Sequence, residues 1–148
     1  MSLSIRSATA ADLPALARMN KRMIEDERNR NPMTLDQLRD RMRGWLGGGW
    51  EIVLFVEDEA ELGYALYQHR KDEYYPENAE VYVRHFYVER GCRGRGLGTL
   101  AFQTLARTRF PVGCTVVLEV LATNPGGDLF WRRAGFELYC ATLKLRLD

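Results

Sequence analysis

The residues best suited to chemistry lie in a glycine- and arginine-rich turn, Arg93-Gly94-Arg95-Gly96-Leu97-Gly98. A strand-like apolar run (81–88) precedes this turn, and a run of helix-forming residues (99–107) follows it. Glycines let the backbone turn tightly and bring its N–H groups close to an anion. The start of a helix adds unpaired N–H donors and the positive end of its dipole, and arginines add charge suited to phosphate oxygens. The turn therefore predicts a site for a phosphorylated ligand.

The overall composition excludes several classes of protein. The 148 residues are 46% hydrophobic and 28% charged, as expected for a single globular domain spanning 1–148. A net charge of +1 argues against a nucleic-acid-binding protein, and clustering of arginines around the turn favours a small polyanion. No segment is long and apolar enough to span a bilayer. We therefore expect neither nucleic acid nor a membrane as a partner.

The cysteines and histidines indicate neither disulfides nor a metal. Three cysteines (92, 114 and 140) leave one unpaired under any disulfide scheme, which favours a reducing compartment and a cytoplasmic protein. His69 and His85 lack the spacing of metal ligands, so we expect no metal site.

Apolar periodicity predicts the elements that position the turn. Strands are expected at 2–7, 50–56, 62–68, 81–88, 115–121 and 136–147, and helices at 9–24, 34–46, 99–107 and 128–134. Thr9 and Thr34 are suited to cap the first two helices. Strands alternating with helices in this way predict an α/β domain with a mixed sheet.

This element order resembles the GNAT superfamily of acyl-CoA-dependent N-acetyltransferases, and two motifs carry the resemblance. The family's pyrophosphate loop, Arg/Gln-x-x-Gly-x-Gly/Ala, is matched by Arg93-x-x-Gly96-x-Gly98. The family also has an Asn followed at seven and eleven residues by an aromatic residue and a Gly-Phe pair. Here those residues are Asn124, Trp131 and Gly135-Phe136. A Walker loop would need a lysine before Thr99, and a dinucleotide-binding fold would place its glycines near the start of a βαβ unit.

The resemblance covers essentially the whole chain and implies a fold and a co-substrate. The fold would be α/β (α+β), with about four helices and a mixed, mostly antiparallel twisted sheet of six to seven strands. The implied element order is β-α-α-β-β-β-α-β-α-β-β. Acetyl-CoA would be the co-substrate, its pyrophosphate on the glycine turn and its pantetheine arm along the fourth strand, with the Val88 N–H as an oxyanion donor. The residues implied to bind it are Phe86, Tyr87, Val88, Arg93, Gly94, Arg95, Gly96, Leu97, Gly98, Thr99, Asn124 and Trp131.

Glu119 is the best candidate for the base that deprotonates an acceptor amine. It interrupts the apolar run 116–121, and a carboxylate placed there needs a partner, access to water or a catalytic task. It also stands five residues before Asn124, where some protein N-terminal acetyltransferases of the family carry a catalytic Glu. The alternative is a solvent-facing or ion-paired side chain without a catalytic role.

Other members of the family place a base on the fourth strand, where this chain has Tyr82. A tyrosine is a poor base at neutral pH because its ordinary pKa is about 10. Glu80 could act through water. Strict alternation places His85 on the face opposite Tyr82 and Arg84, which predicts a packed or hydrogen-bonded histidine.

The proton donor to the leaving thiolate is where this chain departs from the family. Many members carry a Tyr at the position occupied here by Trp131, whose indole N–H can donate a hydrogen bond but cannot deliver a proton. Water or Tyr139 could serve instead. The predicted catalytic residues are therefore Glu119, Tyr82 and Tyr139, and no metal is required.

The acceptor is expected between the first two helices and the loop before the fourth strand. Acidic and aromatic residues at 25–27 and 72–77 suit a cationic amine, although nearby basic residues make solvated loops the better single explanation. The sequence thus predicts an N-acetyltransferase acting by direct attack on a small-molecule amine or a peptide N-terminus. The alternatives are a non-catalytic acyl-CoA-binding or regulatory domain, or an acyltransferase using another acyl-CoA. A homodimer remains open.

Overall fold

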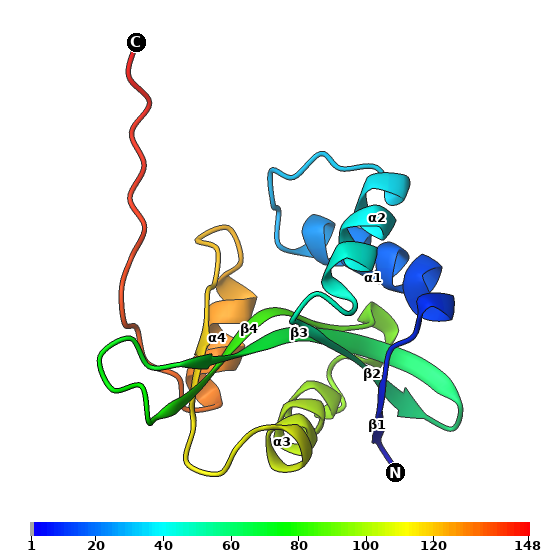
Figure 1. Ribbon diagram of the computed structural model, residues 1–148. Coiled ribbons are helices and arrows are strands. Elements are labelled where there is room, and N and C mark those ends of the chain that lie inside the picture. The colour runs from blue at the N-terminus through cyan, green and yellow to red at the C-terminus, as the bar shows by residue number, and fades with distance from the viewer. Residues whose placement is uncertain (1) are drawn as a thin grey trace.

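The structure is a computed structural model that describes residues 2–148 (Figure 1). The strands are β1 (Ser4–Ser7), β2 (Glu51–Glu57), β3 (Ala60–Lys71), β4 (Ala79–Val88) and β5 (Thr115–Leu118). The helices are α1 (Leu13–Asp26), α2 (Leu35–Trp45), α3 (Leu97–Arg109) and α4 (Pro125–Arg133). Short 3-10 turns at Ala10–Asp12 and Arg90–Cys92 precede α1 and α3.

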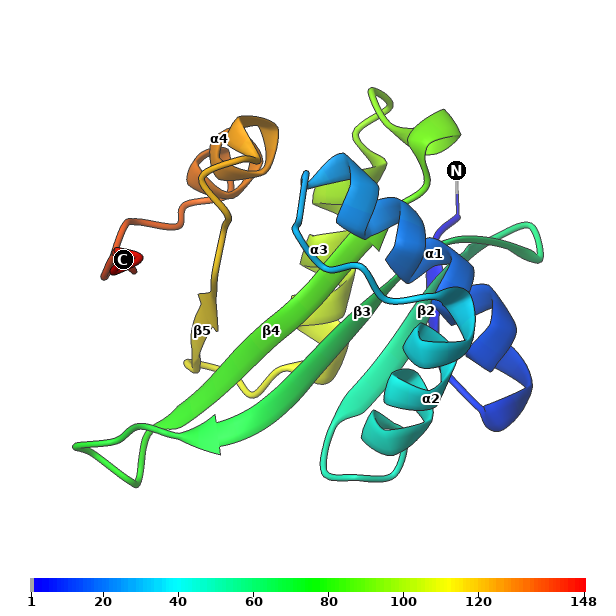
Figure 2. The ribbon, with the colours of Figure 1, turned by 90° about the horizontal axis from the view of Figure 1, so that it is seen from above.

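The five strands form one sheet in the order β1-β2-β3-β4-β5. The first four strands are antiparallel, whereas β5 runs parallel to β4 after the crossover through α3. Helices α1 and α2 cover one face of the sheet and α3 lies against the other (Figures 1 and 2). This arrangement confirms the predicted mixed, mostly antiparallel sheet with four helices.

Alternating side chains of the strands build a separate core on each face. Ile52, Leu54, Tyr64 and Leu66 pack with the apolar stripes of α1 and α2. The strand residues in between face the other way and pack with Ala101 and Leu105 of α3; they are Val53, Phe55, Ala65 and Tyr67. The helix starts follow the predicted caps, since the Thr34 hydroxyl accepts from the Gln37 N–H at 3.2 Å. The Asp12 carboxylate accepts from the Thr9 N–H at 2.8 Å.

A β-bulge interrupts the alternation in the middle of β4. Leu66 of β3 lies opposite His85, but the next residue, Tyr67, lies opposite Val83, so Arg84 has no partner in β3. One extra residue in a strand reverses the facing of every side chain that follows it. The residues that build the candidate site lie on both sides of this bulge.

The C-terminal segment differs from the sequence prediction. Residues 136–147 were expected to add one or two strands, but the sheet has five strands and this segment is extended without pairing to it. It leaves the body after α4 and runs away from it (Figure 1). The predicted fifth strand is also shorter, ending at Leu118 rather than Leu121. An alternating apolar pattern predicts an extended conformation, but a strand also needs a neighbouring edge, which the sequence does not specify.

Within residues 2–148, none of the helices combines the length and the apolar character that crossing a membrane would require.

Candidate active site

The glycine turn leads directly into the N-terminus of α3. Gly96 has a φ of 74°, a left-handed conformation that favours glycine, and helix α3 begins at the next residue. The first intrahelical bond runs from the Leu100 N–H to the Gly96 carbonyl at 3.0 Å. The N–H groups of Leu97, Gly98 and Thr99 therefore have no helical acceptor, which makes this end of α3 suited to an anion such as a pyrophosphate.

A second glycine of the motif has a packing role. A Cβ atom on Gly98 would lie 3.1 Å from the Phe130 ring, so the missing side chain lets α4 approach α3 closely. Asn124 supports the same contact from the other side, because its side-chain oxygen accepts from the Gly127 N–H at 3.1 Å and caps α4. Gly98 thus allows α4 to pack against α3, and Asn124 fixes the start of α4.

The arginines of the turn are engaged with the protein itself. The Arg93 guanidinium donates to the Val88 carbonyl at 2.9 Å and to the Asp26 carboxylate at 2.6 Å. Arg90 binds the same carboxylate at 2.7 Å. Arg95 forms a longer ion pair with Glu57, at 3.4 Å. The arginines tie the turn to the C-terminus of α1, and the backbone N–H groups at the start of α3 stay available for an anion.

The edge of β4 beyond the bulge is open on the side of β5. Pairing between the two strands covers only Glu80–Val83 of β4 and Thr115–Leu118 of β5. The Glu89 N–H donates to the Leu62 carbonyl on β3 at 2.7 Å, so the N–H of the preceding residue, Val88, points the opposite way. The backbone of Phe86 and Val88 therefore faces a side where no strand pairs with it, as an added, strand-like ligand would require.

Tyr82 and Glu119 meet where β4 and β5 separate. The Tyr82 hydroxyl donates a hydrogen bond to a carboxylate oxygen of Glu119, which follows directly after the end of β5. Burial, followed by the interaction with Glu119, raises the pKa of Tyr82 to about 12. The tyrosine therefore stays protonated at neutral pH and donates, and the Glu119 carboxylate is the hydrogen-bond acceptor of the pair. Glu119 itself is exposed rather than buried, so its partner rather than desolvation distinguishes it.

His85 lies on the same face of the sheet as Tyr82, which corrects the prediction from strict alternation. The bulge at Arg84 reverses the facing, and the His85 ring packs edge-on against Trp45 at 5.3 Å between centroids. Its Nδ1 is 3.0 Å from the Tyr64 hydroxyl. Burial, with the nearby charges of Arg41 and Arg84, lowers the pKa of His85 to about 3. The predicted hydrogen-bonded histidine is present, but on the other face.

Aromatic rings and arginines line this face beside Tyr82. Trp50 lies between Tyr82 and Trp45, at ring-centroid distances of 6.0 and 6.1 Å. The guanidinium groups of Arg41 and Arg84 lie 4.8 and 5.2 Å from the centre of the Trp45 ring. Neither forms an ion pair with a carboxylate among residues 2–148. The two positive charges are thus close together, and no carboxylate of the described residues forms an ion pair with either of them.

The burial of Arg41 adds to this imbalance of charge. Its Nη2 donates to the Asn20 side-chain oxygen at 3.2 Å, while its Nε is buried and has no hydrogen-bond partner in the described part of the chain. Burial, and then the charge of Arg84, lower the pKa of Arg41. A carboxylate or another anion next to these groups would offset both effects.

Some of the acidic residues expected to attract a cationic acceptor are engaged within the protein. Glu25 and Asp26 bind Arg90, and Asp26 also binds Arg93. The Asp72 carboxylate accepts from two N–H groups of its own loop, at 2.8 and 2.9 Å. Burial raises the pKa of Glu27, which favours its neutral form. Glu25, Asp26 and Asp72 are thus engaged within the protein, as the alternative of solvated loops without an acceptor role allows.

Two further predicted site residues lie apart from Tyr82 and Glu119. Trp131 of α4 packs edge-on against Phe86 at 5.1 Å and against Phe102 at 5.2 Å, inside an aromatic cluster on the α3 face. Tyr139 lies in the C-terminal segment and is 92% exposed. Within one chain, the structure brings Tyr82 and Glu119 together but does not bring Tyr139 to them.

Sequence reasoning missed Arg41, Trp45 and Trp50 as residues of this site. The sequence carried one signal, two tryptophans flanking the three glycines 47–49. That loop brings the end of α2 beside the start of β2, where Leu46 and Trp50 form an isolated β-bridge. Four candidate groups from separate parts of the chain (α2, β2, β4 and Glu119) thus meet on one side of β4.

Comparisons with known proteins agree with this geometry. The model of the acetyltransferase (GNAT) family matches residues 15–136. The chain belongs to the GNAT family. Its members are acetyltransferases that generally depend on an acyl-CoA. Among curated proteins, none matches this GNAT sequence.

Solved structures share the fold at low sequence identity. A mutant of the BH1408 protein from Bacillus halodurans has a TM-score of 0.80 at 20% identity, covering 97% of this chain and 99% of that one. A predicted acetyltransferase from Clostridium acetobutylicum, solved with acetyl-CoA, has a TM-score of 0.74 at 16% identity, covering 98% and 96%. A ribosomal-protein-alanine N-acetyltransferase from Brucella melitensis has a TM-score of 0.72 at 14% identity, covering 99% and 100%.

Proposed function

We propose that this GNAT domain transfers the acetyl group of acetyl-CoA to a primary amine by direct attack, with Glu119 accepting the proton of the amine. The observation that carries the proposal is the hydrogen bond from Tyr82 to Glu119 at the point where β4 and β5 separate. It puts an oriented proton acceptor next to the open backbone edge of β4. Acyl transfer to an amine needs both features.

Several backbone groups fit acetyl-CoA. The N–H groups at the start of α3 would hold its pyrophosphate, and the edge of β4 at Phe86 and Val88 would pair with its pantetheine arm. When bound, acetyl-CoA supplies the thioester carbonyl that the amine attacks. The Val88 N–H, directed away from β3, is a candidate donor to the oxygen that becomes negative.

Glu119 would take the proton while Tyr82 keeps it in position. A protonated tyrosine with a pKa of about 12 donates to the carboxylate and cannot compete for the proton at neutral pH. The exposure of Glu119 leaves its second carboxylate oxygen open to an amine or to a water between them. The proton donor to the thiolate is solvent in this scheme, because Trp131 cannot deliver a proton.

The acceptor that fits this face carries an anionic group besides its amine. Arg41 and Arg84 flank Trp45 without a carboxylate partner among residues 2–148, whereas Glu25 and Asp26 at the end of α1 already pair with Arg90. A carboxylate between the two guanidinium groups would gain charge-assisted hydrogen bonds. An amino acid or an acidic peptide N-terminus fits this description better than a polycationic amine.

The first experiment measures thermal unfolding with free CoA and with acetyl-CoA, followed by thiol release with paired acceptors. A ligand at 100 times its Kd adds about 2.7 kcal/mol to stability. Each acceptor pair consists of an amino acid and its carboxamide, which differ only in the negative charge. We expect a stability shift with both ligands and faster turnover of the amino acid in each pair.

Other outcomes would replace the proposal. No shift with either ligand would remove the acetyl-CoA site. A shift without thiol release from any amine would favour the non-catalytic acyl-CoA-binding domain. Faster release from a longer acyl-CoA would favour a different donor. Faster turnover of the carboxamides would contradict the proposal of an anionic acceptor but would still support acetyl transfer to an amine.

A further inference from the structure

One polar residue interrupts the buried stripe of α1. The other buried residues of this helix are apolar: Leu13, Leu16, Ala17, Met19, Met23 and Ile24. Asn20 lies among them, and 0% of its surface is exposed. Burying an amide costs free energy unless its oxygen and nitrogen are hydrogen-bonded. An asparagine at this place therefore needs a task that an apolar side chain could not perform.

Asn20 reaches the candidate acceptor site through one hydrogen bond. Its Oδ1 accepts from the Arg41 Nη2 at 3.2 Å. A guanidinium group can only donate, so the amide oxygen must face Arg41 and the Nδ2 is directed elsewhere. This Nδ2 is buried and has no hydrogen-bond partner among residues 2–148. Asn20 therefore holds Arg41 with its oxygen and leaves its own nitrogen unsatisfied.

The guanidinium of Arg41 is held between this amide and an aromatic ring. It lies 4.8 Å from the centre of the Trp45 ring, and the guanidinium of Arg84 lies 5.2 Å from the same ring. A free arginine side chain samples many conformations, and contacts on its guanidinium restrict it to few of them. The charge of Arg41 thus has a defined place beside that of Arg84.

Elsewhere α1 gives arginines a carboxylate rather than an amide. The Asp26 carboxylate accepts from Arg93 at 2.6 Å and from Arg90 at 2.7 Å. A carboxylate at position 20 would have nearly the same shape as the amide, and it would pair with Arg41 in the same way. The amide instead makes a neutral contact, which positions the guanidinium but leaves its charge uncompensated.

We propose that Asn20 sets the charge preference of the acceptor site. It is a positioning residue: it holds the Arg41 guanidinium beside Trp45 and, because it is neutral, leaves the charge of Arg41 to the carboxylate of the acceptor. This role of Asn20 rests on the anionic acceptor proposed above. A negative charge at position 20 would occupy Arg41 and repel the carboxylate of the acceptor.

Asn20→Asp tests this role because it changes the charge of the side chain and little of its shape. Thiol release is measured with glycine, alanine, leucine and phenylalanine and with the carboxamide of each. We expect kcat/KM for the amino acids to fall about 10- to 100-fold, the range for losing a hydrogen bond to a charged group, and kcat/KM for the carboxamides to change little. The loss should appear in KM rather than in kcat, because Asn20 acts through Arg41 and not on the reacting atoms.

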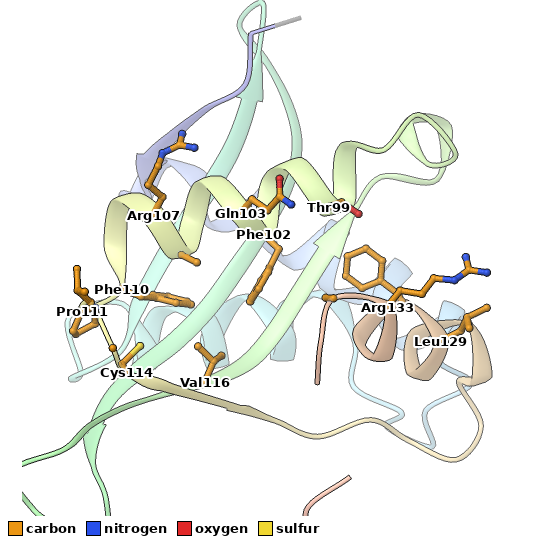
Figure 3. A pocket seen from close by; sticks show the side chains of 16 residues that line it. Thr99, Phe102, Gln103, Arg107, Phe110, Pro111, Cys114, Val116, Leu129 and Arg133 are labelled. Carbon is orange, nitrogen blue, oxygen red and sulfur yellow. The ribbon is translucent and has the colours of Figure 1, made fainter. Parts of the chain in front are cut away.

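A control variant makes the same change from amide to carboxylate away from the site. Gln103 is exposed on α3, on the opposite face of the sheet from α1. Figure 3 shows it at the mainly apolar pocket of about 840 Å³ between α3, α4 and β5. Gln103→Glu should keep the acceptor preference of the wild type.

Asn20→Ala separates the loss of the contact from the added charge. It frees Arg41 without neutralising it, so the amino acids should be weakened less than in Asn20→Asp and should still react faster than their carboxamides. Circular dichroism checks that both variants fold. If Asn20→Asp does not fold, Asn20→Ala decides: a loss confined to the amino acids supports the role of Asn20, and an equal loss for both members of each pair overturns it.

Binding of the N-acetylated forms of the same compounds gives a second readout that needs no turnover. Trp45 lies next to Arg41, so quenching of tryptophan fluorescence reports their Kd. We expect the wild type to bind the anionic N-acetyl amino acids more tightly than their neutral carboxamides. Asn20→Asp should remove this preference, and Gln103→Glu should keep it.

The outcomes distinguish the role of Asn20 from the proposed reaction. If the wild type prefers the anionic compounds in binding but acetylates no amine, the reaction is wrong, and loss of the preference in Asn20→Asp still supports the role of Asn20. If the wild type acetylates amino acids faster than carboxamides and Asn20→Asp keeps that preference, the role of Asn20 is wrong and the reaction stands. A wild type without any preference in binding or turnover would overturn both the anionic acceptor and the role of Asn20.

Discussion

The two sides of β4 present different kinds of groups to a ligand. On the donor side, the turn before α3 and the open edge at Phe86 and Val88 present backbone N–H groups. On the acceptor side, Tyr82, Glu119, Trp45, Arg41 and Arg84 present side chains from separate elements. A backbone site tolerates changes of residue type as long as the conformation is kept. A site made of side chains depends on the type of each residue, so substitutions there let the same fold bind different acceptor molecules.

Removing the proton acceptor is expected to have the largest effect. Glu119→Gln keeps the shape of the side chain and a hydrogen-bond acceptor for Tyr82, but it takes away the basic oxygen. We expect kcat to fall at least about 100-fold, the lower range for general-base catalysis, with the Kd for acetyl-CoA unchanged. Thiol-release kinetics and calorimetry measure the two quantities.

The control for this variant is Glu59→Gln. It removes an exposed carboxylate in the turn between β2 and β3 and should leave kcat near that of the wild type. Equal losses in both variants would return Glu119 to a structural role.

Removing one charge from the acceptor side should change the choice of acceptor. Arg84→Gln is expected to lower kcat/KM for an amino acid about 10- to 100-fold, since a hydrogen bond to a charged group contributes about 1.5–3 kcal/mol. The carboxamide of the same amino acid should be affected little. Arg18→Gln, which removes an exposed arginine of α1, is the control. If both acceptors slow equally in Arg84→Gln, the anionic acceptor is wrong.

A conformational change on the donor side should weaken acetyl-CoA binding. Gly96→Ala adds a side chain to a residue with a φ of 74°, where no atom would obstruct the new Cβ. The left-handed conformation costs about 1–2 kcal/mol for such a residue, which predicts a roughly 5- to 30-fold rise in Kd if the turn relaxes. Gly91→Ala, also unobstructed but without a positive φ, should bind normally. Calorimetry measures the Kd for acetyl-CoA of both variants. Equal affinities would show that the turn at Gly96 does not take part in binding.

The buried histidine predicts a dependence of stability on pH. The pKa of His85 is about 3 in the folded protein and 6.5 in its ordinary state, so the unfolded chain binds the proton more readily. The contribution of neutral His85 is complete above pH 6.5 and is lost as the pH falls toward 3. The loss is at most about 1.4 kcal/mol for each pH unit in this window.

Chemical denaturation of two variants tests this assignment. His85→Gln should flatten the decline in unfolding free energy below pH 6.5. The exposed His69 serves as the control, because His69→Gln should leave the decline as it is in the wild type. A decline that persists in His85→Gln would place its source elsewhere.

The sequence predicted the donor side better than the acceptor side. The element order as far as α4, both helix caps and the family were correct, because each depends on residues near one another in the chain. The predicted face of His85 was wrong because of the bulge at Arg84. The bulge moves the side chains that follow it to the other face of the sheet, and the sequence carries no clear pattern that marks it. The predicted C-terminal strand was also wrong. Its apolar residues do alternate, but a strand must also lie next to the edge of another strand, and residues 136–147 do not pair with the sheet.

Sequence alone therefore determined the glycine turn, the start of α3 and the family, since backbone conformation there is decided by neighbouring residues. Tertiary structure decided the contact between Tyr82 and Glu119, which are 37 residues apart, and the grouping of two arginines around Trp45. It also decided that Glu25 and Asp26 pair with Arg90. Contacts between distant segments depend on strand register and on how helices lie against the sheet, and these are properties of the whole fold.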